Sequence, residues 1–182
     1  MKWIESAGGP LVMIGESSVS DWSGIEYVGD STDYQRACSI EDYLGIIEVQ
    51  SGSAIVFGDE PLRTCWIPDG KRGGVIVRWI YGQDETSLIE IALTGPGSGQ
   101  FELVSEDSFR SRDEVHRLFD AAIPGGLLRS EEHLSLNLAI GSYAIKTMVV
   151  RVETPETAVL LHELQVRKYL PGPTGSTASF PC

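Results

Sequence analysis

The sequence predicts a β-rich α+β fold, an antiparallel two-sheet, sandwich-like domain with one or a few short helices. Many short segments of β-branched and aromatic residues are bounded by glycine, proline and serine, which is typical of strands joined by turns. The clearest is VIVRWIY at residues 75–81, where both faces are apolar except at Arg78. Such a strand is expected inside a sheet that is covered on both sides. A total of about eight to ten strands with few helices favours two packed sheets.

Turn chemistry joins neighbouring segments into hairpins. Residues 63–67 precede residues 75–81 across a Pro-Asp-Gly turn and a following glycine pair, so we expect these two segments to pair. Residues 46–49 and 54–57 are separated by a short Ser-Gly-Ser stretch. That stretch favours a second tight hairpin.

Five further segments have the composition of strands. Residues 11–14 and 101–104 are short apolar runs, and residues 88–93 have an alternating pattern. Leucines alternate over residues 134–138, and residues 143–152 follow after a glycine-serine turn. We expect the last two segments to form a hairpin with each other.

Helices are expected to be few. Residues 16–22 can form one helical turn, and residues 33–44 follow three potential N-cap residues and end at a glycine. Two segments remain open between helix and strand, residues 111–122 and residues 155–168. Each begins like a helix, with a capping box or a Thr-Pro-Glu start, yet each also carries the alternation of a strand.

The length of 182 residues favours one domain. We expect that domain to span residues 1–170. The tail, residues 171–182, is rich in proline, glycine, serine and threonine and is expected to be flexible.

The sequence also predicts where the protein is located and the state of its cysteines. No apolar run approaches about 18 residues, and the first ten residues lack the apolar core of a secretory signal. Cys38, Cys65 and Cys182 lack metal-ligand spacing, which favours reduced structural thiols. A cytoplasmic protein with no membrane partner is therefore expected.

The negative charge is unevenly distributed. The chain has 26 acidic and 14 basic residues, a net charge of −12. Residues 1–60 hold eleven acids and two bases, whereas residues 61–182 hold fifteen acids and twelve bases. The first third therefore carries −9 and the remainder −3. Such a field repels nucleic acid and anionic lipid and attracts a basic partner, although solubility alone would also explain an acidic protein.

A search for catalytic or cofactor chemistry finds no complete motif. His162-Glu163 begins like a zinc-protease motif, but position 166 is valine, so the second histidine ligand is missing. The sequence has no phosphate-binding loop, no dinucleotide fingerprint and no nucleophile elbow. Its acidic doublets lie at expected turns, where they are usually solvated. We therefore predict no enzyme activity, no metal site and no cofactor.

Four residues decide between scaffold and pocket. Arg78 is the single charge in an apolar strand, and a buried guanidinium needs polar partners. Trp22, Trp66 and Trp79 are core residues by default. An exposed tryptophan beside acids would instead indicate a binding hot spot.

Several blocks of the sequence resemble the immunity protein 21 family. The resemblance is most specific over residues 3–81, looser at residues 118–120 and 141–143, and absent in the tail. The blocks are WIESAGGPL at residues 3–11, ES at 16–17, DWSG at 21–24, DYQRAC at 33–38, DYLG at 42–45, GDEPL at 58–62 with Thr64 and Trp66, and VRW at 77–79.

The resemblance implies a protein that neutralises a toxin of a bacterial polymorphic toxin system in the cytosol. Such proteins bind their cognate toxin domain and block it sterically, and they are not enzymes. Many of these toxins are basic nucleases. An acidic protein can bind such a nuclease by imitating the negative charge of its nucleic-acid substrate. The charge asymmetry leads to a hypothesis for the toxin-binding residues, which are Glu16, Asp21, Trp22, Asp59 and Glu60.

Two alternatives remain open. The first is a small-ligand-binding or regulatory β-sandwich module, in which Trp66 and Trp79 line an apolar pocket beside Arg78. The second is a hydrolase in which converging carboxylates act with His116 or His162.

Overall fold

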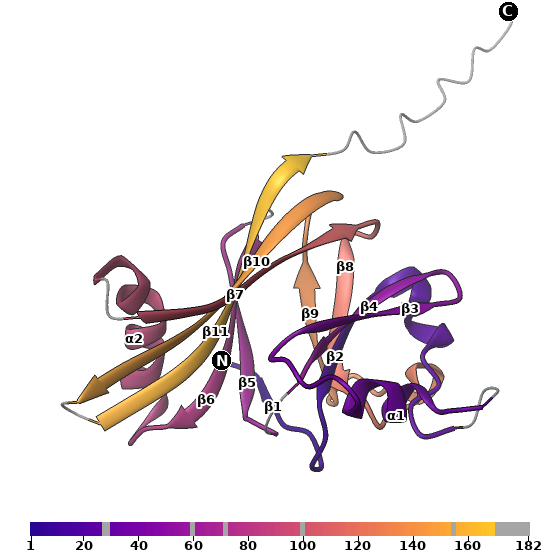
Figure 1. Ribbon diagram of the computed structural model, residues 1–182, viewed down its shortest axis with the longest axis horizontal. Coiled ribbons are helices and arrows are strands. Elements are labelled where there is room, and N and C mark those ends of the chain that lie inside the picture. The colour runs from indigo at the N-terminus through magenta and orange to yellow at the C-terminus, as the bar shows by residue number, and fades with distance from the viewer. Residues whose placement is uncertain (27–29, 59–60, 71–72, 99–100, 154–155, 170–182) are drawn as a thin grey trace, which may run out of the picture.

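The computed structural model describes residues 1–26, 30–58, 61–70, 73–98, 101–153 and 156–169, and within these ranges it forms two antiparallel sheets (Figure 1). The six-stranded sheet has the order β1 (Trp3–Ile4), β5 (Thr64–Pro68), β6 (Gly73–Tyr81), β11 (Glu156–Tyr169), β10 (Gly141–Glu153), β7 (Phe101–Ser111). The five-stranded sheet has the order β3 (Gly45–Val49), β4 (Gly52–Phe57), β2 (Leu11–Gly15), β8 (Val115–Asp120), β9 (His133–Asn137). The predicted β-rich, two-sheet sandwich is confirmed.

Strand β6 has the central position that its sequence predicts. It pairs with β5 on one side, forming the expected hairpin, and with β11 on the other. Ile76 and Arg78 point between the two sheets, whereas Val77 belongs to the cluster on the outer face. The apolar character of both faces therefore reflects burial on both sides.

Within the described ranges, four helices lie outside the sandwich, and three of them have six residues or fewer. They are η1 (Glu16–Asp21), α1 (Asp33–Cys38), α2 (Glu85–Ser98) and η2 (Gly125–Leu127). A capping box starts α1, because Thr32 and Gln35 exchange side chain-to-backbone hydrogen bonds of 3.0 Å. The helix ends at Cys38, earlier than the predicted residue 44. Ser39 adopts the C-cap position and its hydroxyl donates to the Arg36 carbonyl at 2.7 Å.

The strand predicted for residues 88–93 is wrong, since these residues belong to α2. Leu88 and Ala92 lie four residues apart on one helix face and are both buried against the six-stranded sheet. The Asp84 carboxylate accepts hydrogen bonds from the Ser87 backbone at 3.0 Å and the Ser87 hydroxyl at 2.9 Å, which begins the helix. These bonds lower the pKa of Asp84.

Both segments left open by the sequence are strands. Residues 111–122 contain β8, and residues 155–168 fall almost entirely in β11. The hairpin predicted between residues 134–138 and 143–152 is wrong, because β9 pairs with β8 while β10 pairs with β11 and β7. The alternating leucines of β9 and the inward residues of β10 pack face to face across the core. Because β9 and β10 face each other across the core, they lie in different sheets.

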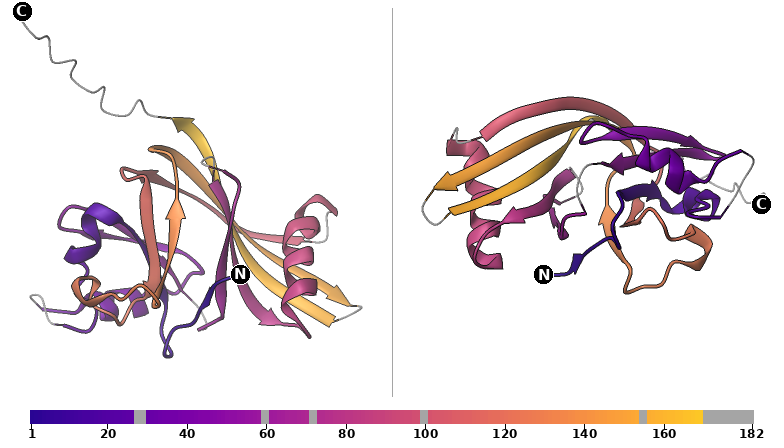
Figure 2. Two further views of the ribbon diagram at one scale, coloured as in Figure 1. Left: turned by 180° about the vertical axis from the view of Figure 1, so that it is seen from behind. Right: turned by 60° about the horizontal axis from the view of Figure 1, so that its bottom comes forward.

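The apolar core has three parts. The largest lies between the sheets and includes Phe57, Ile76 and Tyr143. A second lies under η1 and α1, on the outer face of the five-stranded sheet. A third lies under α2, on the outer face of the six-stranded sheet, so α1 and α2 occupy opposite ends of the molecule (Figure 2).

One side of the sandwich is tied together at its edge strands. Strands β1 and β5 of one sheet lie against β9 of the other. The Lys2 ammonium adds hydrogen bonds to the carbonyls of Ser130 at 2.8 Å and His133 at 2.7 Å. The edge strands at the far ends of the two sheets are β7 and β3. A pocket lies where the end of β7 approaches the β3–β4 turn.

Candidate functional site

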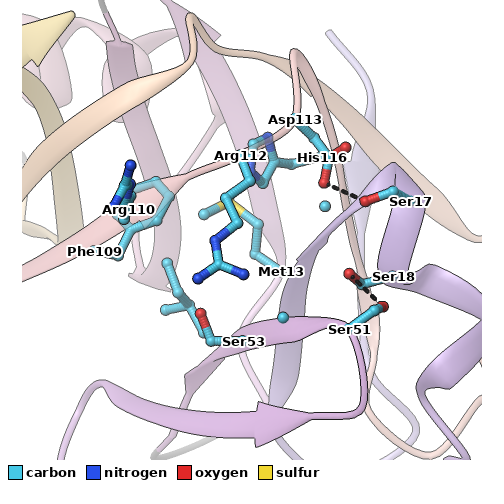
Figure 3. Close-up of a pocket in the computed structure, with 13 residues that line it drawn as sticks. Met13, Ser17, Ser18, Ser51, Ser53, Phe109, Arg110, Arg112, Asp113 and His116 are labelled. Carbon is cyan, nitrogen blue, oxygen red and sulfur yellow. Dashed lines mark hydrogen bonds between the residues drawn. The ribbon is translucent and has the colours of Figure 1, made fainter. Parts of the chain in front are cut away.

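The pocket is built by four separate parts of the chain (Figure 3). They are η1, the turn between β3 and β4, the end of β7 and the start of β8. We call it the serine–arginine pocket, and its lining residues are Met13, Gly15, Ser17, Ser18, Ser51, Gly52, Ser53, Ile55, Phe109, Arg110, Arg112, Asp113 and His116. Its volume of about 40 Å³ has room for very few atoms, whereas metabolite sites usually reach several hundred Å³.

The floor of the pocket is apolar and continuous with the core. Met13 and Ile55 rise from the five-stranded sheet, and Phe109 comes from β7. The Phe109 ring stacks on Tyr143 with centroids 5.2 Å apart and meets the edge of His116 at 6.2 Å. The site is therefore anchored to both sheets at once.

Hydrogen bonds fix η1 to the loops on either side of it. The Ser17 hydroxyl donates to the Asp113 carboxylate at 2.9 Å, toward the start of β8. At the other end of η1, the Asp21 carboxylate accepts from the Ser51 backbone N–H at 3.0 Å and from the Ser51 hydroxyl. That hydroxyl also lies 3.0 Å from Ser18 Oγ. Because these polar groups already satisfy one another, the rim is a preformed surface.

His116 is not arranged as a general base. Its side chain is buried, and Nδ1 has no hydrogen-bond partner in the described part of the chain. Nε2 lies 3.5 Å from Ser111 Oγ, but that hydroxyl donates to the Asp113 backbone carbonyl at 2.8 Å. Burial lowers the pKa of His116 to about 4, so the imidazole is neutral near pH 7.

The buried histidines make the fold sensitive to mild acid. The pKa of His116 falls from 6.5 in the unfolded chain to about 4 in the folded one, so unfolding takes up a proton between these values. Stability is complete above pH 6.5 and declines as the pH falls toward 4. Because of His116, we expect the free energy of unfolding to fall by about 2 kcal/mol between pH 7.5 and pH 5. Urea unfolding at the two pH values measures this change.

A His116→Gln variant should lose this part of the pH dependence. His162 remains in that variant, and its pKa is also lowered, by burial and then by the nearby Arg78 charge. The residual slope should therefore have the same sign. Equal slopes in the two proteins would contradict the assignment to His116.

Arg110 and Arg112 stand apart from the other arginines. Both are exposed on the pocket rim, and neither forms an ion pair with a described residue. The Arg112 guanidinium points toward Ser53 over the pocket (Figure 3). Sequence reasoning missed this site, since its serines and arginines are far apart in the chain and match no motif.

The described residues that are predicted to bind a toxin have different surroundings. Glu16 and Asp21 occupy the two ends of η1. Glu16 pairs with Arg117, whose Nη2 lies 2.9 Å from Oε1, and this hydrogen bond holds the Glu16 pKa below its usual value. Asp59 and Glu60 lie outside the described residues.

Trp22 lies in the core beneath these groups. Its side chain is 1% exposed, and Nε1 donates to the Ala121 carbonyl at 2.9 Å. The prediction that it is a core residue is confirmed. Its ring presents no free face to a partner, so any contribution to a binding surface is made through the position of η1.

The pocket expected beside Arg78 is not formed around that residue. Arg78 is fully buried between the sheets and donates to the Gly58 carbonyl at 2.8 Å. Trp79 belongs to the outer face, where the Arg63 guanidinium lies 5.2 Å from its ring and 5.5 Å from that of Trp3. Trp66 packs against the main core and is partly accessible, where it lines a surface groove with Val115 and Asn137. Arg78 is therefore scaffold.

The histidines do not support a hydrolase either. His162 is fully buried, 3.1 Å from the Thr147 hydroxyl and edge-on to Phe57. Neither it nor His116 hydrogen bonds to a carboxylate among the described residues. In the same ranges, no group of three His, Cys, Asp or Glu side chains is placed to hold a metal ion.

Exposed acids gather around α1 and β3. They are Glu26, Asp30, Glu41, Asp42 and Glu48, and within the described ranges none forms an ion pair. The nearby Arg36 is already occupied, because it pairs with Asp33 at 2.8 Å and donates to the Glu48 carbonyl. We call these five residues the α1 acidic cluster. It lies at the end of the molecule away from α2 (Figure 1).

Ion pairs neutralise the same share of the described acids in both parts of the chain, three of nine up to residue 58 and five of fifteen after it. Glu102 pairs with Arg151, Glu106 with Arg167, and Glu132 with Arg129. The charge asymmetry in the sequence therefore reflects the small number of basic residues in the first third, two against twelve in the remainder. The uncompensated carboxylates of the first third remain available at the surface.

Fold and site together define a β-rich sandwich with an acidic end and a preformed polar rim. The chain matches the family model of immunity protein 21 over residues 2–157 and belongs to that family. No curated protein and no solved structure gives a significant match. Within the described part of the chain, no helix has the length and apolar character needed to cross a membrane.

Proposed function

We propose that this protein neutralises a cognate bacterial toxin domain by stoichiometric binding in the cytosol, without catalysis. Membership of the immunity protein 21 family supports the role. The observation that carries the mode of binding is the α1 acidic cluster, which is exposed and unpaired in the described part of the chain. Glu16, which pairs with Arg117, and Asp21, which accepts hydrogen bonds from Ser51, are included in the proposal from the sequence, as are Asp59 and Glu60.

The chemistry favours a basic partner. Unpaired surface carboxylates attract a positively charged protein at long range and raise its association rate. A nuclease has a cationic surface for its polyanionic substrate. An acidic inhibitor can occupy that surface sterically and electrostatically, and this requires no reacting group. A nuclease toxin is therefore the partner class that the charge pattern favours.

The proposal is tested with the toxin domain encoded beside the gene for this chain. The test variant combines Glu41→Lys, Asp42→Lys and Glu48→Lys. We expect its association rate with the toxin to fall about 10- to 100-fold at low salt, and its salt dependence to become shallow. Stopped-flow or surface-based kinetics at several ionic strengths provide the measurement.

A matched control carries the same change in net charge at other exposed acids. It combines Asp69→Lys, Glu114→Lys and Glu153→Lys, and should retain most of the wild-type rate. Equal losses in the two variants would show that only net charge matters. Failure of the wild-type chain to bind the toxin, or a covalent change in the toxin's intact mass after incubation, would overturn the proposed function.

A further inference from the structure

Strand β7 has an unusually long free edge. It extends over 11 residues and pairs with β10 on one side. On the other side it meets no strand in the described part of the chain, and its outward backbone groups have no hydrogen-bond partner there. The other edge strands are much shorter, with two residues in β1 and five each in β3 and β9. A long free edge is a template for pairing with another chain.

The first half of this edge is apolar on one face. Phe101 is 40% exposed and Leu103 is 52% exposed on this face, and Val104, 37% exposed, follows at a bulge where it has no partner in the β10 ladder. Phe101 lies opposite Val150 and Leu103 opposite Met148 in the ladder. Since Val150 and Met148 belong to the core under α2, Phe101 and Leu103 continue that apolar face out to the edge.

We call Phe101, Leu103 and Val104 the β7 apolar patch. Single exposed leucines are common, but a group of large apolar side chains beside an unpaired edge indicates an interaction site.

The opposite face of β7 is acidic. Glu102 lies opposite Val149 and Asp107 opposite Ile145, so both side chains point away from the α2 face. The strand contains three acids, one arginine and no lysine. Lysines are a common protection of free edges, and β7 lacks that protection. A strand added along residues 101–103 would find Phe101 and Leu103 on the α2 face and Glu102 on the other, whereas beyond the bulge Glu106 lies on the α2 face, opposite Lys146.

We propose that the free edge of β7 binds an extended segment of the toxin, which adds to the six-stranded sheet as an antiparallel or parallel strand. This inference rests on the proposed function. Backbone hydrogen bonds would supply the pairing and alternate side chains the specificity. The pattern on β7 selects a segment with apolar residues facing Phe101 and Leu103 and a basic residue facing Asp107.

Charge selects the toxin over a second copy of this chain. Two copies would bring together net charges of −12 each and place acidic β7 strands side by side. A basic segment instead complements Asp107, which forms no ion pair among the described residues, whereas Glu102 is already paired with Arg151. The toxin is therefore the occupant that the observations favour.

Hydrogen–deuterium exchange of the wild-type chain, free and bound to the toxin domain encoded beside its gene, tests the backbone pairing. We expect amides within residues 101–107 to exchange at least tenfold more slowly in the complex. Binding and neutralisation of the toxin with unchanged exchange at β7 would overturn this inference and leave the proposed function standing. Absence of binding would overturn both.

A substitution tests the apolar patch. Leu103→Lys should weaken toxin affinity at least tenfold, whereas Leu127→Lys, at a 66% exposed leucine on η2, should change it less than twofold. Both residues are exposed, so unfolding curves should match the wild type. Full affinity of Leu103→Lys would contradict the inference. A free wild-type dimer that Leu103→Lys dissociates, seen by light scattering, would assign the edge to self-pairing instead.

Discussion

Replacing Arg78 with alanine is expected to lower the free energy of unfolding by about 3–5 kcal/mol. The guanidinium is fully buried in the central strand β6 and donates to the Gly58 carbonyl at 2.8 Å. Truncation leaves a cavity between the sheets and removes the donor from a buried carbonyl. Urea unfolding of the two proteins at pH 7.5 measures the difference.

An Arg78→Met variant separates the two causes of that loss. Methionine fills much of the same volume but donates no hydrogen bond, so it should recover part of the loss seen with alanine. If the Arg78→Ala variant were as stable as the wild type, the scaffold role of Arg78 would be contradicted. If both variants fold, we expect each to bind the toxin normally, because Arg78 lies between the sheets, away from any proposed contact.

Replacing Trp22 with alanine is the second large effect, again about 3–5 kcal/mol. The indole fills the core between η1, α1 and the five-stranded sheet, and its N–H reaches the Ala121 carbonyl. Gly125 of η2 also donates to the Trp22 carbonyl at 2.8 Å. The residue therefore holds η1 and η2 in place.

Trp22→Phe provides the comparison, since it keeps an aromatic ring and loses the hydrogen bond. We expect an intermediate stability, with the Ala121 carbonyl left without the indole donor. Thermal unfolding followed by circular dichroism ranks the three proteins. A phenylalanine variant less stable than the alanine variant would contradict this account.

The sequence predicted the features of the fold that depend on local periodicity. The β5–β6 and β3–β4 hairpins follow from alternating apolar residues and short turns. At residues 88–93 the same reasoning failed, because closely spaced leucine and isoleucine residues satisfy both a helix and a strand. The deciding signal was Asp84 followed by Ser87, a helix start that outweighs alternation.

The candidate site could be predicted only in part. Acidic residues of the first third are visible in composition, yet the sequence does not show that Glu16 is neutralised by Arg117. The contact of Ser17 with Asp113 joins residues 96 positions apart, and such a contact depends on the register of the sheets. The free edge of β7 is likewise a property of strand order, which periodicity does not determine.

The strand order has a consequence for how the protein is made. Strand β2, near the start of the chain, lies between β4 and β8, and β6 lies between β5 and β11, the last strand described. Neither sheet can be completed until the ribosome has reached β9 and then β11, so the early acidic segment must wait for partners synthesised much later. Under the proposed function, a partly translated chain would not bind the toxin, so protection of the cell depends on molecules whose synthesis is already complete.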